Sequence, residues 1–156
     1  MAGRIVAQTH APDRFVAVNG IIGGMKNTPT PRANITVYGI PNCDSVKKAR
    51  SWLAERAADC TFHDFKKHGV PADLLPVWLA AVGWQTLMNR KGTTWRKLDE
   101  ATRLAVVDDA SATALMLSQA SVIKRPVVVW GDGRVSEGFD PAAFAAYLST
   151  DEKPAT

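Results

Sequence analysis

Residues 35–50 read ITVYGIPNCDSVKKAR, and this stretch decides the fold. The run from Ile35 to Ile40 is rich in β-branched and aromatic residues and stops at Pro41, which predicts a short buried strand. A helix is expected from Asp44, because apolar residues then recur on one helical face while basic residues cover the other. The apolar positions are Val46, Ala49, Leu53 and Ala57. The chain therefore passes from a strand directly into an amphipathic helix.

The rest of the chain completes a recognisable order of elements. CTFHDF (residues 60–65) predicts a second strand, parallel to the first through a right-handed crossover. Gly131-Asp132-Gly133 between two apolar runs predicts a hairpin, and residues 89–100 are expected to form an exposed, cation-rich loop. Helices are expected at residues 72–82, 111–119 and 141–148, and a further short turn at residues 84–88. The order β-α-β, helical insertion, β-β-α is that of an α/β thioredoxin-like fold with a mixed four-stranded sheet.

The domain is expected to span residues 34–149, with the helical insertion at about 71–120. Residues 1–33 contain glycines, prolines and scattered polar residues without a period, which predicts a disordered arm. Met25 is an alternative start of the chain, and residues 150–156 are expected to be a tail.

The bulk composition restricts the function. No apolar run approaches the roughly 20 residues that span a bilayer, and no secretory signal is visible, so we expect a cytoplasmic protein without membrane contact. The net charge of +4 is spread among acidic residues and accompanies no nucleic-acid-binding motif, so nucleic acid is not the expected partner. His63 and His68 lack a further ligand at metal spacing, so no metal site is expected.

Cys43 is the expected nucleophile. It lies between the first strand and the helix, where free amides and the helix dipole stabilise a thiolate. Asn42 and Asp44 flank it and favour exposure of the thiol. The alternative is an inert buried cysteine.

The second redox thiol is not next to Cys43. A CxxC pair would need a cysteine where Val46 stands, and a phosphate-binding Cys-x5-Arg loop would need an arginine at Ala49. Cys60 opens the parallel second strand, so at about 3.3 Å per residue it should lie roughly 15 Å away, beyond disulfide reach. The site therefore needs an external thiol, and Cys60 is expected to be a small core residue.

Three segments in order, YGIPNCDSVKKAR, LMNRKGTTWRKLDE and SVIKRPVVV, resemble the arsenate reductase-like (ArsC/Spx/YffB) family. The similarity covers about residues 35–149 and is closest to the branch of glutathione-dependent thiol reductases. It implies Cys43 as the catalytic cysteine, Arg90 and Arg125 as anion-binding residues, and Pro126 as a cis-proline facing the cysteine. The alternative for Pro126 is an ordinary proline at the start of a strand, and the alternative for Arg125 is a surface cation.

Two further features follow from the resemblance. Gly138 stands where arsenate reductases carry a third arginine, which makes arsenate reduction doubtful. In GTTWRKL, Thr93, Thr94, Arg96 and Lys97 offer donors for a glutathione carboxylate, or only cap a loop.

The function implied is a thiol-disulfide oxidoreductase without a bound cofactor, with glutathione or another small thiol as co-substrate. It would reduce a mixed disulfide or a small oxidised substrate. The alternatives are an arsenate reductase linked to glutathione or glutaredoxin, and an Spx-like regulator that binds RNA polymerase.

Overall fold

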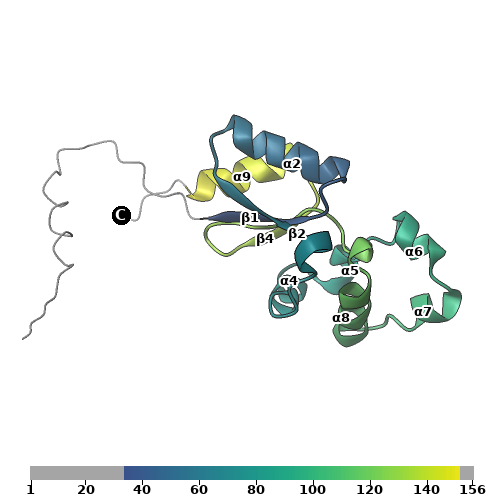
Figure 1. Cartoon of the computed structure of the whole chain (residues 1–156). Helices are drawn as coiled ribbons and strands as arrows, with labels where there is room; N and C mark the ends of the chain where they lie inside the picture. Colours follow the sequence, from purple (N-terminus) through teal and green to yellow (C-terminus); the bar gives the residue numbers. More distant parts are fainter. Residues whose placement is uncertain (1–33, 152–156) are drawn as a thin grey trace, which may run out of the picture. The chain divides into compact units, whose positions relative to one another are not determined.

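The computed structural model describes residues 34–151, and the expected arm (1–33) and most of the expected tail (152–156) lie outside them. Four strands form one mixed sheet in the order β2-β1-β3-β4. The strands are β1 (Ile35–Gly39), β2 (Cys60–Asp64), β3 (Val127–Val129) and β4 (Val135–Glu137). β2 pairs parallel to β1, whereas β3 pairs antiparallel to β1 and β4 antiparallel to β3 (Figure 1). The predicted thioredoxin-like order and mixed sheet are confirmed.

The helices include those predicted from the sequence, together with short helices that were not predicted. They are α2 (Asp44–Glu55), α3 (Phe65–His68), α4 (Leu75–Val82), α5 (Trp84–Leu87), α6 (Thr93–Lys97), α7 (Glu100–Leu104), α8 (Asp109–Ser118), the 3-10 helix η2 (Ala120–Val122) and α9 (Pro141–Asp151). Among these described residues, no helix has the length and apolar character needed to cross a membrane.

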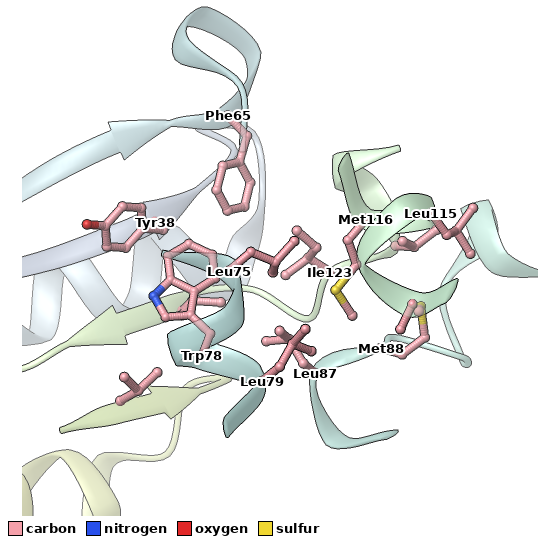
Figure 2. Packing of buried hydrophobic residues seen from close by; sticks show 14 of the residues in the cluster. Tyr38, Phe65, Leu75, Trp78, Leu79, Leu87, Met88, Leu115, Met116 and Ile123 are labelled. Atoms are coloured by element: carbon pink, nitrogen blue, oxygen red, sulfur yellow. The ribbon is translucent and has the colours of Figure 1, made fainter. Parts of the chain in front are cut away.

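The sheet separates two buried clusters, because successive side chains of a strand point to opposite faces. Ile35 and Val37 of β1 lie in a cluster with residues of α2 and α9, including Trp52 and Phe144. Tyr38 lies in the other cluster, which is built mainly from the helical insertion. Figure 2 shows this second cluster, with Tyr38 and Phe65 near Trp78 and Leu75 of α4, and with Met116 and Leu115 of α8 beyond them. The insertion therefore has its own apolar contacts with the sheet.

Helix α2 is held tightly against β1. A Cβ built on Gly39 would lie 2.7 Å from Cγ2 of Val46, so only a glycine allows this approach. The helix ends at Glu55, two residues before Ala57, the last residue of the predicted apolar face, because Ala57 adopts a left-handed backbone with φ of 52°. The close approach of Val46 to Gly39 thus holds the first turn of α2 directly after Cys43.

The predicted loop at residues 89–100 is wrong. The segment contains α6 and the first residue of α7. Trp95 and Leu98 pack against the insertion cluster, and the Arg96 side chain donates to the Lys91 carbonyl at 2.6 Å and 3.2 Å. Packing of two apolar residues thus stabilises a helix in a sequence that reads as polar.

Helix α8 begins two residues earlier than predicted. The Asp108 carboxylate accepts a hydrogen bond from the Ser111 amide at 2.8 Å, and the Ser111 hydroxyl accepts one from the Asp108 amide at 3.1 Å. This reciprocal cap satisfies free amides of the first turn and fixes the start of the helix.

Candidate functional site

Cys43 is the N-cap residue of α2. A turn brings it there, because its amide donates to the Ile40 carbonyl at 3.3 Å with Pro41 and Asn42 between. The Cys43 carbonyl accepts from the Lys47 amide at 3.0 Å, and no side chain caps the helix. Cys43 is half-buried, whereas its neighbours Asn42 and Asp44 are exposed. The thiol therefore lies at the positive end of the helix dipole with access to solvent.

Arg125 and Pro126 lie at the same end of the sheet as Cys43. Tyr38 of β1 pairs with Val127 of β3, and the two strands are antiparallel. The residues after Tyr38, which lead to Cys43, therefore lie at the same end of the sheet as the residues before Val127, which are Arg125 and Pro126. The Arg125-Pro126 peptide is cis, as the resemblance implied, and Pro126 is buried.

Arg125 has an unsatisfied donor. Its side chain is half-buried, and its Nε is buried without a hydrogen-bond partner among the described residues. Because a buried polar group nearly always has a partner, an unpaired guanidinium nitrogen at this position is suited to an anionic ligand.

Cys60 lies at the opposite end of the sheet. It pairs in register with Ile35, the first residue of β1, whereas Cys43 follows four residues after the last residue of β1. Cys60 packs half-buried at the edge of the cluster that contains Val37. Burial raises the pKa of its thiol, while Arg50 acts to lower it and Asp59 to raise it. The chain thus keeps its second thiol far from the first and protonated.

Arg90 has different surroundings from Arg125. Its guanidinium carbon lies 5.1 Å from the ring centre of Trp84 and 5.8 Å from that of Trp95. The backbone segment that precedes Arg90 is hydrogen-bonded to the segment that precedes Arg125. Met88 forms a β-bridge with Ile123, and the Lys124 amide donates to the Leu87 carbonyl at 2.8 Å.

The remaining residues implied by the resemblance lie on α6. Thr94 is half-buried, and Arg96 is exposed with two of its donors used on the Lys91 carbonyl. The structure shows no contact of either residue with Cys43, so their role toward glutathione stays a prediction, as does that of Arg90.

Gly138 stands beside the cis-proline. Its amide donates to the Pro126 carbonyl at 2.8 Å, and its φ is 75°. The nearest cation is Lys124, whose Nζ lies 2.8 Å from Oε2 of Glu137. Gly138, Lys124 and Glu137 also line a hollow of about 560 Å³ at the β4 edge, which Cys43 does not line. The position that the resemblance assigns to the third arginine of arsenate reductases therefore holds a glycine, and the lysine next to it is ion-paired.

Arg103 was missed by the sequence reasoning. It lies on α7, and its Nε is buried without a hydrogen-bond partner in the described part of the chain. Together with Arg90 and Trp95 it lines a pocket of about 540 Å³. Nothing in the local sequence distinguishes Arg103 from a surface cation, because the pocket exists only once α6 and α7 have packed.

Two histidines come close without forming a metal site. The rings of His63 and His68 lie 5.4 Å apart, and Nε2 of His63 is 2.9 Å from the Gly69 carbonyl. Within residues 34–151, no group of three potential ligands gathers around a common point.

Comparisons with known proteins found relatives of similar sequence. An uncharacterised protein of Haemophilus influenzae is 38% identical over 112 residues, which cover 72% of this chain and 96% of that protein. The Spx global transcriptional regulator of Streptococcus pyogenes is 26% identical over 120 residues, covering 75% of this chain and 87% of the regulator.

Solved structures show the same fold. A YffB protein superposes with a TM-score of 0.69 at 52% identity, covering 73% of this chain and 98% of its own. An arsenate reductase-related protein of Brucella melitensis gives 0.60 at 48% identity, covering 79% and 98%. The model of the ArsC family matches residues 38–147, from Tyr38 in β1 to Tyr147 in α9. With its arsenate reductase-like thiol oxidoreductase fold, the chain belongs to the ArsC family.

Proposed function

We propose that the protein is a thiol-disulfide oxidoreductase that uses Cys43 as its single nucleophile and glutathione as the external thiol. The separation of the two cysteines supports this proposal most directly. Cys43 is the N-cap residue of α2 at the end of the sheet that carries Arg125-Pro126, whereas Cys60 pairs with Ile35 at the far end of β1. Both cysteines are free, as expected for a reducing compartment, and we place the reaction in the cytoplasm.

The reaction has two balanced thiol exchanges. The Cys43 thiolate attacks the glutathione sulfur of a mixed disulfide, so a Cys43–glutathione disulfide forms and the substrate leaves as a thiolate that takes a proton from water. A second glutathione thiolate then attacks the glutathione sulfur of that adduct. Glutathione disulfide forms, and the Cys43 thiolate is regenerated. The net reaction consumes one glutathione thiolate: its sulfur is oxidised to disulfide while the substrate sulfur is reduced to thiol, and the other sulfur of glutathione disulfide comes from the mixed disulfide itself.

Arg125 is suited to hold the anionic part of glutathione. Its buried, unpaired Nε lies at the end of the sheet where α2 begins. A guanidinium stays charged when it is desolvated and presents parallel donors to a carboxylate.

Two alternative functions, arsenate reduction and Spx-like regulation of transcription, have less support. Gly138 stands where the resemblance places a third arginine, and the nearby Lys124 ammonium is paired with Glu137. A redox switch of the CxxC kind would need a second thiol at Val46, which is fully buried.

The test is steady-state turnover with glutathione, comparing a panel of glutathione mixed disulfides with arsenate. We expect turnover of mixed disulfides, its loss in Cys43→Ser and its retention in Cys60→Ser. Turnover of arsenate alone would replace this proposal by arsenate reduction. Copurification with RNA polymerase without any turnover would replace it by a regulatory function.

A further inference from the structure

The pocket of about 540 Å³ between α6 and α7 has an unusual lining. It contains two arginines, Arg90 and Arg103, against one carboxylate, Glu100. No ion pair joins these three side chains in the part of the chain that the structure describes. The lining therefore keeps an excess of positive charge that is not neutralised within the domain.

Aromatic rings restrain the side chain of Arg90 at this pocket. Its guanidinium lies within 6 Å of two indole rings, at 5.1 Å from Trp84 and 5.8 Å from Trp95. Stacking on aromatic faces restricts an arginine without using its hydrogen-bond donors. Within residues 34–151 no hydrogen bond uses the N–H groups of this guanidinium, which leaves them to bind a ligand.

Arg103 supplies the second observation. Its Nε is buried but has no acceptor among the described residues. Burying a charged donor without an acceptor is costly, and such an unpaired group in a pocket marks the place of a missing acceptor. A carboxylate fits, because a guanidinium binds its two oxygens through parallel hydrogen bonds.

The rim of the pocket is apolar and exposed. Leu104 and Val107 both line the pocket, and each is 69% exposed. A small hydrophilic anion would leave these two side chains in water. A polypeptide that carries an apolar side chain next to an acidic one would cover them while its carboxylate reached the arginines.

We propose that this pocket docks an acidic, apolar peptide segment of a protein substrate. The inference deepens the proposed function, because it makes the physiological mixed disulfide one carried by a protein. The docked segment places a carboxylate between Arg90 and Arg103 and an apolar side chain against Leu104 and Val107. Arginine and tryptophan are the residues that most often dominate such protein contacts.

Binding is measured by fluorescence anisotropy with a labelled octapeptide of alternating glutamate and leucine, using full-length Cys43→Ser protein. We expect saturable binding. Replacing the glutamates of the peptide with glutamine, or its leucines with alanine, should each weaken binding about tenfold or more. The assay has no redox step, so its failure leaves the turnover of Cys43 untouched, and a failed turnover leaves this binding untouched.

Variants of the pocket identify the site. Arg103→Lys keeps the charge but loses Nε, and we expect about a tenfold loss of affinity, the scale of one charge-assisted hydrogen bond. Leu104→Glu changes an exposed residue that folding does not need and should weaken binding at least as much. Glu100→Gln should strengthen it, and Arg50→Lys on α2 serves as the matched control with no effect.

Three results would overturn the proposal. Equal binding of the glutamate and glutamine peptides would show that no carboxylate is recognised. Equal binding of the leucine and alanine peptides, with displacement by free glutathione, would show a small-anion pocket. Absence of saturable binding, or unchanged binding in both Arg103→Lys and Leu104→Glu, would show that peptides do not dock here.

Discussion

The Cys60 residue is half-buried, and this burial raises the pKa of its thiol although Arg50 acts in the opposite direction. In Cys43→Ser protein we therefore expect the alkylation rate of Cys60 to rise with pH to a midpoint above that of the same protein unfolded in urea. Arg50→Gln should raise this midpoint further. A folded midpoint at or below the unfolded one would contradict the burial of the thiol.

The same shift makes stability depend on pH. The folded pKa exceeds the unfolded pKa, so between the two values the unfolded chain has lost its proton while the folded chain keeps it. The contribution of Cys60 to stability is thus fully present below the unfolded pKa and falls as the pH rises through this alkaline window. Cys60→Ala should remove that part of the decline, as measured by urea unfolding at several pH values.

A substitution at Arg125 tests how the protein binds glutathione. Arg125→Lys keeps the positive charge but loses the buried Nε, so glutathione binding should weaken by about 1 to 3 kcal/mol. Titration calorimetry measures the affinity, and the alkylation rate of Cys43 at neutral pH is the second readout, which should change little. Unchanged affinity with a large fall in alkylation rate would show that the arginine activates the thiolate instead. Arg50→Lys is the control.

At the scale of elements, the contact between β1 and α2 positions the nucleophile. A Cβ on Gly39 would lie 2.7 Å from Cγ2 of the fully buried Val46. Gly39→Ala should therefore destabilise the fold by about 1 to 3 kcal/mol, the usual cost of overpacking. This exceeds the gain of roughly 0.4 to 1 kcal/mol that alanine brings by restricting the unfolded chain.

A double variant isolates this contact. Val46→Ala removes the clashing methyl groups, so Gly39→Ala should cost much less in that background than in the wild type. Urea unfolding of the four proteins gives the coupling free energy. Strictly additive changes would mean that the close approach does not limit the packing of α2.

The elements that the sequence predicted correctly are those defined by local patterns. β1 and the start of α2 follow from Pro41 and the apolar face of the helix, and the hairpin follows from the glycines on both sides of Asp132. Helix α6 was missed, because its stability comes from the packing of Trp95 and Leu98 against residues distant in sequence. Local polarity alone could not reveal that packing.

The same distinction holds for the candidate site. Cys43 and the cis peptide before Pro126 were predicted from motifs, and the sheet register brings both to one end of the sheet. The surroundings of Arg103, and the approach of Arg90 to the rings of Trp84 and Trp95, depend on how α5, α6 and α7 pack together. No spacing within one segment encodes an arrangement shared by three helices.

For the whole molecule, the central claim is that electrons reach Cys43 from outside the chain. The sheet holds the two cysteines at opposite ends, since Cys60 pairs with Ile35 and Cys43 lies beyond Gly39. The most direct measurement is peptide mass mapping of protein oxidised with glutathione disulfide and quenched in acid. We predict one glutathione on the peptide that contains Cys43, with Cys60 still a free thiol. An intramolecular disulfide between Cys43 and Cys60 would contradict both the geometry and the external-thiol mechanism.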